Sequence, residues 1–583
     1  MGKGGIHIKY YEIMCGIAGI ISSDFSRKDF LKMLELQSHR GPDNTGIYED
    51  PGFAILGHNR LSIIDLSPGS NQPFLDPSER FILSFNGEIY NYLELKEELR
   101  FEYDFKTNSD TEVLLAAYLV YGKDCLNKLN GMFSFAIWDS LEKVLFAARD
   151  RFGVKPFYYS LKDSQLTFAS EIKTLRSGLN NDIPSSKVWA NYFAYGTYGE
   201  PNETFFEEIF QLPAGHYLNY SEGDFTLTKW YHFAENVKKI EISGDLEETK
   251  KTYLELLQNS ISLRFRADVP VGFNLSGGVD SSLLLALVNK SQNNKHIQAF
   301  TFYTGDERYD ELFWVKKMIS LTTNPLNLVK LVPQEVPLLS KHISFYEDEP
   351  FGGVPTLAYS KIFEDARNRD ILVLLDGQGM DEQWAGYDYY ATENDAVIQG
   401  LDPKISPFKM NCLSQILRDN IDKTNYPRPF KDPLRNKQYR DLFHTKIPRA
   451  LRFNDRISMA HSTELREPFL DHRLVEFAVA QPKHFKINGN THKFLLREII
   501  KDLVPKEISY TPKRPLQTPQ REWLGMELKV WVEEQLKSLA NSQYSSWFNH
   551  EEIEKEWQSY LEGENSSSFH IWQWVNFSLL FPN

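Results

Sequence analysis

Short apolar runs separated by turn residues dominate the first third of the chain. Residues 81–85 (FILSF), 133–138 (FSFAIW) and 144–148 (VLFAA) are each bounded by Gly, Asp, Asn or Lys. Such runs are typical of strands in a layered sheet. Helical patterns intervene at residues 93–99 and 110–121. Together they predict a sheet-rich α+β domain.

The pattern changes around residues 220–245, where polar and charged residues dominate. Beyond this segment short apolar strands alternate with long helical patterns. A strand at 273–275 precedes a helix at about 280–290, and further strands follow at 299–303 and 372–375. This alternation predicts a parallel α/β sheet, so we place a domain boundary in the polar segment.

The C-terminal part from about residue 449 is mostly helical by its hydrophobic period. The whole chain has 583 residues, and a single hydrophobic core rarely grows beyond about 250–300 residues. We therefore expect at least two domains, at residues 15–225 and 240–583, with a helical region at the end of the second.

Charge and cysteine content exclude several classes of protein. The net charge of −14 disfavours a nucleic-acid partner, because an acidic surface repels phosphate backbones. Cys15, Cys125 and Cys412 lie far apart without zinc-ligand spacing, which favours reduced thiols and a cytoplasmic location. We expect no membrane segment, because no apolar run reaches the roughly 18 residues of a spanning helix, and the start of the chain lacks the apolar block of a signal peptide.

The strongest local signal is residues 274–282 (NLSGGVDSS), where a buried strand runs through Ser-Gly-Gly into a helix. Glycines let the backbone approach an anion, and the free N–H groups at a helix start point toward it. The run matches neither the Walker nor the GxGxxG dinucleotide pattern. A plain strand-to-helix turn is the alternative. Asp280 beside the turn favours phosphate with a bridging metal, since an acid next to phosphate is otherwise unfavourable.

A second Gly-rich turn follows a strand at residues 374–382 (LLDGQGMDE). In a doubly wound sheet, two strand ends of this kind flank the ligand crevice. Asp280 and Asp381 are therefore predicted to bind Mg²⁺ together, although Asp381 alone would more commonly be a helix N-cap.

These residues resemble a known family. The run SGGVDSS is similar to the pyrophosphate loop of ATP pyrophosphatases that activate carboxylates as acyl adenylates. Residues 451–478 and 489–497 resemble the asparagine synthetase domain. The resemblance implies that Lys493 contacts phosphate and stabilises the transition state, although a lone lysine is usually a solvated helix residue. It also implies an ATP site formed by Leu275, Ser276, Gly277, Gly278, Asp280, Ser281, Ser282, Phe302, Asp376 and Gly377.

The first half resembles class II glutamine amidotransferases, whose mature chains begin with cysteine. Cys15 follows Met14, and residues 39–43 (HRGPD), 60–64 (RLSII) and 86–91 (NGEIYN) are similar to family segments. The resemblance implies an Ntn-type αββα layered domain in which the Cys15 thiolate attacks the glutamine amide. The free α-amine would be the base, and its ordinary pKa of roughly 7.7–8.0 suits that role. Taken alone, Cys15 would more commonly be a small buried apolar residue.

The same resemblance implies roles for further residues. Arg60 would hold the glutamine carboxylate, and Asp110 its α-ammonium group. The side chain of Asn86 and the backbone N–H of Gly87 would form the oxyanion hole. A structural arginine, a hairpin turn and a helix N-cap are the respective alternatives. The full predicted glutamine site is Arg60, Leu61, Ser62, Ile63, Ile64, Asn86, Gly87, Glu88 and Asp110.

Two departures from the family change what is expected. Residues 1–14 precede Cys15, and an amide nitrogen cannot act as a base, so we expect this extension to be absent from the mature protein. Gln378, a predicted catalytic residue, stands where many asparagine synthetases have Glu, and Gln cannot accept a proton. The resemblance also weakens after about Leu516, at KRPLQTP.

The resemblance therefore implies a glutamine-hydrolysing asparagine synthetase that uses ATP and Mg²⁺ to amidate aspartate through an acyl adenylate. A homodimer is the family expectation, although oligomeric state cannot be read from the sequence. One alternative is a related amidotransferase acting on another carboxylate, in surface-polysaccharide or secondary metabolism or as an intramolecular amide former. The other is a glutaminase with an inert C-terminal module. The intact sites in both halves argue against the intramolecular ligase and against the glutaminase.

Overall fold

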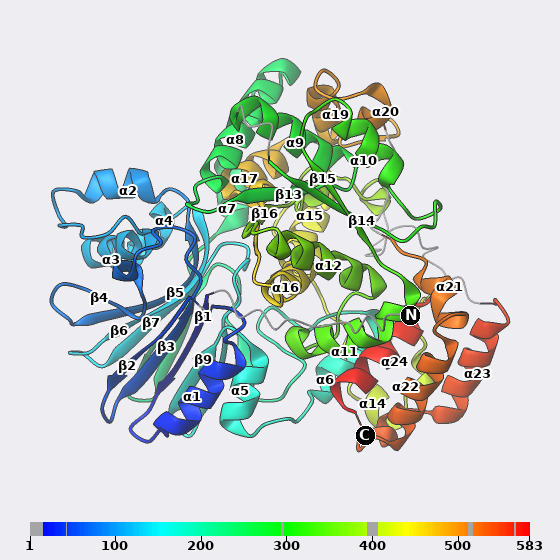
Figure 1. Cartoon of the computed structure of the whole chain (residues 1–583), viewed down its shortest axis with the longest axis horizontal. Helices are drawn as coiled ribbons and strands as arrows, with labels where there is room; N and C mark the ends of the chain where they lie inside the picture. The colour runs from blue at the N-terminus through cyan, green and yellow to red at the C-terminus, as the bar shows by residue number, and fades with distance from the viewer. Residues whose placement is uncertain are drawn as a thin grey trace, which may run out of the picture.

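The computed structural model describes residues 15–41, 43–292, 297–392, 406–510, 517–564 and 567–582. An N-terminal domain of two sheets lies beside a second domain built around a parallel sheet (Figure 1). The extension at 1–14 lies outside the described residues, as do Pro42 of the HRGPD turn and most of the KRPLQTP segment.

Two six-stranded antiparallel sheets face each other in the N-terminal domain, with strand orders β10-β8-β9-β1-β3-β2 and β12-β11-β7-β6-β5-β4. Helices α1 (Arg27–Leu36) and α5 (Ile172–Leu179) pack on the first sheet, and α3 (Asp110–Tyr121) packs on the second, beside α2 (Tyr92–Leu99). This confirms the predicted αββα layers. The strands are β1 (Gly16–Ile21), β2 (Asn44–Asp50), β3 (Ala54–Arg60), β4 (Phe74–Leu75), β5 (Phe81–Ile89), β6 (Gly131–Asp139), β7 (Val144–Arg149), β8 (Tyr158–Lys162), β9 (Gln165–Ala169), β10 (Phe210–Gln211), β11 (His216–Ser221) and β12 (Asp224–Lys229).

Strand β1 is apolar along its whole length because both of its faces are buried. Successive side chains of a strand point to opposite faces of the sheet. Ile17 and Ile21 pack into the core between the two sheets, while Ala18 and Ile20 pack into the core that contains residues of α1. Both faces are therefore buried, and no alternation of apolar and polar residues appears.

The first domain extends beyond the expected limit at residue 225. Strand β12 pairs with β11 from Asp224 to Lys229 and completes the edge of the second sheet. Its side chains are mostly exposed, so the polar composition that suggested a linker belongs partly to an edge strand.

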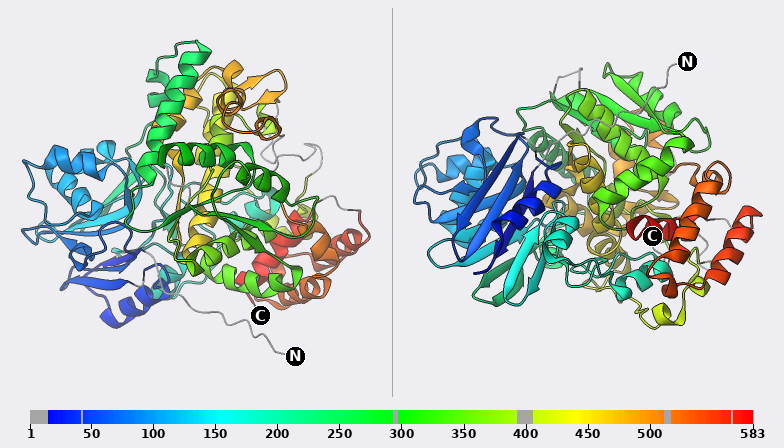
Figure 2. Two further views of the ribbon diagram at one scale, coloured as in Figure 1. Left: turned by 45° about the horizontal axis from the view of Figure 1, so that its top comes forward. Right: turned by 60° about the horizontal axis from the view of Figure 1, so that its bottom comes forward.

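A five-stranded parallel sheet of order β15-β14-β13-β16-β17 forms the centre of the second domain. Helices cover both faces (Figure 2). Ala299 of β14 packs in a core with residues of α8 and α9, and its neighbour Phe300 packs on the opposite side with residues of α11 and α12. The strands are β13 (Val271–Asn274), β14 (Ala299–Tyr303), β15 (Leu326–Lys330), β16 (Val373–Leu375) and β17 (Glu464–Arg466).

The parallel sheet confirms the predicted alternation, and the region after residue 449 is mostly helical, as expected. The main helices are α6 (Ser186–Tyr195), α7 (Phe233–Lys239), α8 (Leu246–Arg264), α9 (Val279–Gln292), α10 (Leu312–Ile319), α11 (Val336–Glu347), α12 (Val354–Asn368), α13 (Met380–Gln383), α15 (Pro433–Phe443), α16 (Lys446–Met459), α17 (His472–Ala480), α19 (Phe494–Ile500), α21 (Gln520–Gly525), α22 (Lys529–Asn541), α23 (His550–Leu561) and α24 (Phe569–Leu580).

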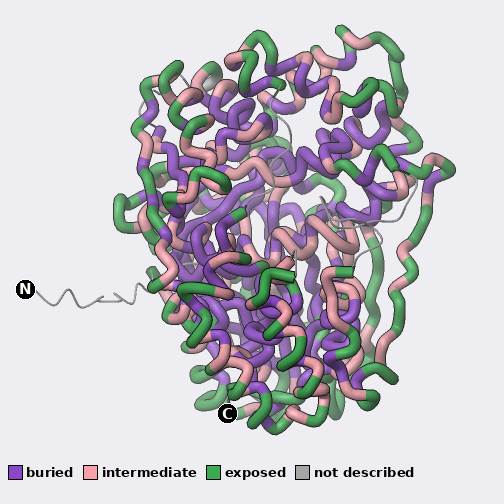
Figure 3. The backbone as a smooth tube through the Cα atoms, turned by 90° about the vertical axis from the view of Figure 1, so that its right-hand side faces the viewer, coloured by how far each residue is buried: buried purple, intermediate pink, exposed green. Residues whose placement is uncertain are grey.

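The two domains share a continuous hydrophobic core. Trp189 of α6 contacts Phe577 of α24 with ring centroids 4.7 Å apart, and both side chains are fully buried. Buried segments run through the centre of the molecule, and exposed segments lie mainly at its periphery (Figure 3). None of the described helices is both long enough and apolar enough to cross a membrane.

Candidate active sites

A cavity at the edge of the N-terminal sheets brings together the residues predicted to bind glutamine. Cys15, Arg60, Asn86, Gly87 and Asp110 all line it. Of the predicted set only Ser62 is not among the lining residues; its backbone N–H donates instead to Asp43 Oδ2 at 2.8 Å. The remaining lining residues are Leu61, Ile63, Ile64, Gln72, Phe85, Glu88, Ser109, Thr111 and Glu464.

The thiol of Cys15 lies against the loop that follows β3. The backbone N–H of Leu61 donates to Cys15 Sγ at 3.3 Å. Burial raises the pKa of the thiol to about 12, and the carboxylates of Glu88 and Glu464 add to the shift. Because the thiolate is the nucleophile, this cysteine needs a base close to its sulfur.

Asn86 and Gly87 lie side by side on β5 and are suited to an oxyanion hole. Gly87 has φ +146°, and a Cβ built there would lie 2.1 Å from the carbonyl oxygen of Met132. Only glycine fits this position. Asn86 Nδ2 makes a long 3.5 Å contact with Ser170 Oγ, so its amide is only weakly engaged and can turn toward a ligand.

Two charged groups of the cavity have different surroundings. The guanidinium of Arg60 is held by the carbonyl of Ser67 at 2.9 Å and by Asn71 Oδ1 at 2.8 Å. Asp110 Oδ2 accepts a hydrogen bond from the backbone N–H of Ile89 at 2.9 Å. Burial raises the pKa of Asp110 to about 7. The carboxyl is therefore ready to ionise when a cation, such as an α-ammonium group, enters.

Glu464, at the start of β17, closes this cavity from the second domain and was not predicted. Arg466 Nε lies 2.7 Å from Glu464 Oε1, and Arg466 Nη2 lies 3.4 Å from Glu88 Oε1. The cavity is thus completed only when the two domains are in contact. Glu464 lies within the segment that resembles the synthetase domain. Nothing in the sequence indicates that it also lines a cavity of the N-terminal domain.

The second predicted site lies at the carboxyl ends of the parallel strands. The loop after β13 turns at Gly277, which has φ +73°. Ser281 Oγ accepts the backbone N–H of Ser276 at 3.2 Å. Helix α9 begins directly after this loop, as an anion-binding turn requires. Leu275 is buried beside the loop, and Phe302, near the end of the adjacent strand β14, is half-buried.

Lys493 joins the two predicted acidic loops. Its Nζ lies 2.6 Å from Asp280 Oδ2 and 2.6 Å from Asp381 Oδ1. A Cβ on Gly386 would lie 2.4 Å from Lys493 Cε, so this glycine leaves the space that the lysine side chain fills. The loop at 276–282 and the turn at Asp381 therefore meet at one position, the ammonium of Lys493.

The two carboxylates fit the requirements of Mg²⁺. Asp280 and Asp381 converge on one cation, the ammonium of Lys493. Mg²⁺ in nucleotide sites is usually held by one or two carboxylates together with phosphate oxygens. The described residues contain no group of three or more His, Cys, Asp or Glu that could hold a metal alone, so bound phosphate would have to complete the coordination.

Asp376 and Gly377 begin the second loop, directly after β16. Asp376 Oδ1 accepts the backbone N–H of Gly377 at 2.7 Å. A Cβ on Gly377 would lie 3.4 Å from the nitrogen of Ser281, so the two loops are in close contact. Gln378 follows and is half-buried.

Strands β16 and β17 connect the two sites. Val373, the first residue of β16, pairs in register with Glu464 and packs in one apolar cluster with Leu61 and Ile63, which line the first cavity. The carboxyl end of β16 leads into Asp376 and the second predicted acidic loop. One end of these short strands therefore meets the first site and the other end meets the second.

Arg40 forms a buried ionic link between the domains. Its Nε donates to the carbonyl of Cys15 at 3.1 Å, and Nη1 donates to Glu171 Oε1 at 3.0 Å. Its Nη2 contacts both oxygens of Asp455 on α16, at 3.2 and 2.9 Å. Arg40 was noticed only as part of the HRGPD turn, and its partner in the second half could not be read from the sequence.

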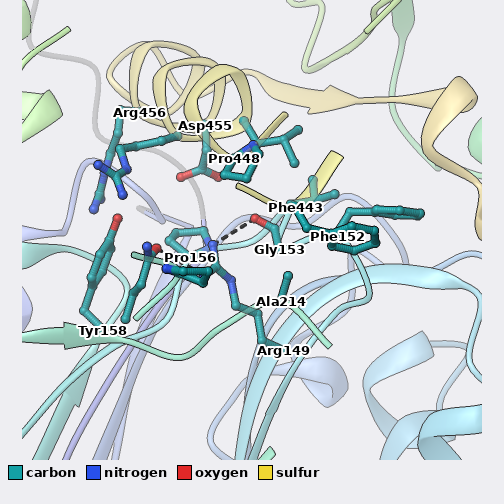
Figure 4. A pocket seen from close by; sticks show the side chains of 15 residues that line it. Arg149, Phe152, Gly153, Pro156, Tyr158, Ala214, Phe443, Pro448, Asp455 and Arg456 are labelled. Atoms are coloured by element: carbon teal, nitrogen blue, oxygen red, sulfur yellow. Dashed lines mark hydrogen bonds between the residues drawn. The ribbon is translucent and has the colours of Figure 1, made fainter. Parts of the chain in front are cut away.

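A further cavity lies at the domain interface, between the loop after β7 and helix α16 (Figure 4). Asp455 and Arg456 line one side, and Arg149 lines another. Arg149 is held by several carbonyls, including that of Gly153 at 2.8 Å. None of the residues predicted to bind glutamine or ATP lines this cavity.

Comparison with known proteins gives one family match for each half of the chain. Residues 14–231 match the family model of a glutamine amidotransferase domain, and residues 252–581 match that of asparagine synthase. The chain is 29% identical to asparagine synthetase [glutamine-hydrolyzing] 1 of Bacillus subtilis, over 89% of each chain. It is 32% identical to asparagine synthetase [glutamine-hydrolyzing] 2 of the same organism, over 86% of this chain and 71% of that one. It is 28% identical to amidase chry2 of Gibberella zeae, over 89% of this chain and 91% of that one.

Proposed function

The chain belongs to the asparagine synthase family of glutamine-dependent, ATP-using ligases, and we propose that it transfers the amide nitrogen of glutamine to a carboxylate, with aspartate as the first candidate. The observation that carries the proposal is the arrangement of two sites at opposite ends of strands β16 and β17. Cys15 and the glutamine-binding set lie at one end, and Asp280, Asp381 and Lys493 lie at the other.

In the first half-reaction the Cys15 sulfur attacks the side-chain amide carbon of glutamine. Asn86 and the Gly87 N–H stabilise the oxyanion, Arg60 binds the α-carboxylate and Asp110 binds the α-ammonium group. Ammonia leaves, and water releases glutamate from the thioester. The base is the α-amine of Cys15, which requires that residues 1–14 be absent from the mature protein. Translation from Met14 with removal of the methionine, or proteolysis, would expose it.

In the second half-reaction the acceptor carboxylate attacks the α-phosphorus of ATP. Residues 276–282 bind the phosphates, and Lys493 stabilises the negative charge that develops there. Mg²⁺ held by Asp280 and Asp381 would neutralise charge on the pyrophosphate group. Ammonia then displaces AMP from the acyl adenylate. A closed passage between the sites would keep ammonia neutral and water away from the adenylate.

Gln378 favours a second candidate for the acceptor. A glutamine at this position cannot take a proton, so the pocket differs from that of relatives with Glu. A carboxylate other than aspartate, in surface-polysaccharide or secondary metabolism, is therefore the alternative substrate. The glutamine half-reaction would be the same.

The deciding experiment measures AMP and pyrophosphate formation with glutamine, ATP and a panel of carboxylates, with aspartate tested first. We expect release of both products to depend on one acceptor and to yield its amide. Glutamate release without AMP, whatever the acceptor, would contradict the ligase function.

N-terminal sequencing of protein from the native host tests the exposed Cys15, and a mature chain that retains Met1 would contradict it. Size-exclusion chromatography tests the proposed homodimer.

A further inference from the structure

Two carboxyl groups meet where strands β16 and β17 end. Leu375 pairs in register with Arg466, and the backbone N–H of Asp376 donates to the carbonyl of Arg466 at 3.0 Å. Asp376 and Glu467 are therefore the first residues beyond the paired strands, at the carboxyl edge of the sheet. Ligands of open parallel sheets bind at this edge, and Asp376 begins the nucleotide loop described above.

Glu467 is buried at this edge and only partly satisfied. The residue is 3% exposed, and Asn454 forms a hydrogen bond with its side chain. Its Oε2 atom has no hydrogen-bond partner within the part of the chain that the structure describes. An unpaired buried polar atom costs about 1–3 kcal/mol, and Glu467 Oε2, at the strand end next to Asp376, is therefore available to bond to a ligand.

The charges around Glu467 keep its proton exchangeable near neutral pH. Burial raises the pKa of this carboxyl to about 8, and the adjacent Asp376 adds to the shift. Lys155 and Arg264 act in the opposite direction. A group with a pKa near the working pH is well suited to accept and release a proton during a reaction.

The proposed reaction needs such a group, and Gln378 cannot provide it. Two other acids lie nearby, the half-buried Asp376 and the buried Glu382, whose Oε2 atom also has no partner among the described residues. Asp376 accepts the N–H of Gly377 at 2.7 Å, and Glu382, which is fully buried, accepts the hydroxyl of Tyr387 at 2.8 Å. Among these three residues only Glu467 meets three conditions. It lies directly beyond a strand end, one of its oxygens lacks a partner among the described residues, and it is not next to Asp381 in the sequence.

We propose that Glu467 is the base that removes a proton from the attacking nitrogen as the amide forms. This inference rests on the proposed ligase function. The nitrogen of ammonia forms a bond to the acyl carbon, and the bond between that carbon and the phosphate oxygen of AMP breaks. AMP leaves with the bonding electron pair, and the proton lost by the nitrogen passes to the Glu467 carboxylate. Product release returns the proton to solvent.

The location of Glu467 also suits nitrogen arriving from the other site. Glu464 lines the glutamine cavity and Glu467 lies three residues further along the same segment. An extended strand rises about 3.3 Å per residue, so the two positions are roughly 10 Å apart. Glu467 is thus placed where nitrogen that leaves the glutamine cavity would reach the adenylate.

The test compares Glu467→Gln, which keeps the size of the side chain and removes its basicity, with wild-type protein. We expect amide formation from glutamine or from ammonium to fall roughly 10²-fold, the usual contribution of a general base. Glutamate release and ATP–pyrophosphate exchange should remain near wild-type values. Hydroxylamine, whose nitrogen gives up a proton more readily after attack, should show a much smaller loss.

A rescue variant and a matched control sharpen the result. Adding Gln378→Glu to Glu467→Gln restores a base in the same cleft and should recover much of the amide formation. Glu347→Gln makes the same change at a carboxyl that is fully buried on α11, and should leave the ratio of amide formation to pyrophosphate exchange unchanged.

Three outcomes are decisive. Full amide formation by Glu467→Gln, or an equal loss of pyrophosphate exchange, would overturn the assignment of Glu467 while leaving the ligase function intact. A wild-type protein that forms no AMP with any carboxylate would overturn the proposed function, and the role of Glu467 with it. Selective loss of amide formation, with rescue at residue 378, would support the proposal.

Discussion

Burial governs the ionisation of Cys15 and Asp110 in the first site, whereas Asp280, Asp381 and Lys493 compensate one another's charges by direct ion pairing in the second. Burial raises the pKa of Cys15 to about 12 and that of Asp110 to about 7. In the second site, Asp280 and Asp381 both contact the ammonium of Lys493 at 2.6 Å. Cys15 and Asp110 are therefore expected to acquire charge only when a base and glutamine are in place, whereas the ion pairs of Lys493 exist before a nucleotide binds.

The difference follows from what each site binds. Glutamine brings one carboxylate and one ammonium group, which Arg60 and Asp110 can match one to one. ATP brings several negative charges. The site that binds it needs a cation in place, and before ATP arrives that cation must be neutralised by nearby carboxylates. Lys493 meets that need, because a single point cation can contact both carboxylates and can later turn to phosphate.

The largest effect expected is from Cys15→Ala. Removing the nucleophile should lower glutamine-dependent amide formation by roughly 10⁴-fold or more, while ammonium-dependent formation continues, because the nucleotide cleft is unchanged. Parallel assays with the two nitrogen sources measure this. The control is Cys125→Ala: burial also raises the pKa of Cys125 to about 12, but it does not line the cavity. Retained glutamine-dependent activity in Cys15→Ala would refute the assignment of the first site.

The reverse pattern is expected from Lys493→Ala. AMP formation should fall roughly 10²–10³-fold with either nitrogen source, because a preorganised cation is lost from the developing charge, while glutaminase activity should persist. Lys493→Arg should not rescue, since Gly386 leaves little space beside Lys493 Cε. Lys501→Ala, at a lysine on the surface paired with Glu498, is the control. Equal losses in both half-reactions would mean that the two sites are not separable.

The pH dependence of glutamine use should show two ionisations. The value of kcat/KM for glutamine should fall tenfold per pH unit below the pKa of the cysteine amine, roughly 7.7–8.0. Asp110 is protonated below about pH 7 and then cannot pair with the α-ammonium, so the slope should approach two below that pH. In Asp110→Asn only the ionisation of the cysteine amine should remain in the pH profile. A slope of one throughout in the wild-type enzyme would argue against Asp110 as the ammonium ligand.

The smallest effect expected is from Asp455→Asn, which weakens the link between the sites. Arg40 would keep Glu171 and lose a charged partner, which should lower the free energy of unfolding by about 1–3 kcal/mol in denaturant titrations. More glutamate should be released per AMP, because the domains are held together less firmly. Asp139→Asn, the control, changes a more exposed Arg–Asp pair with Arg80 inside the N-terminal domain. The prediction fails if Asp455→Asn releases the same amount of glutamate per AMP as the wild-type protein.

Local features of both sites could be predicted because they depend on a few consecutive residues. The strand-turn-helix at 276–282 and the start of α3 at Asp110 are determined by short-range preferences of glycine, serine and capping residues. Gly87 is required by one backbone angle and one contact. The sheet-rich first domain and the parallel sheet of the second were likewise readable, because hydrophobic period and the alternation of strands with helices are properties of contiguous sequence. The αββα layering was expected only from the family resemblance, and the order of strands within each sheet depends on tertiary structure.

Tertiary structure alone decided which distant residues share a site. Lys493 and Asp280 are separated by 213 positions, and Arg40 and Asp455 by 415. Glu464 and Glu467 read as ordinary charged residues of a family segment until β17 pairs with β16 and brings one to the glutamine cavity and the other to the nucleotide loop. Composition and hydrophobic period indicate which residues of a segment are buried. Contacts between distant segments depend on how the whole chain packs, and so do the pKa values of the groups in those contacts.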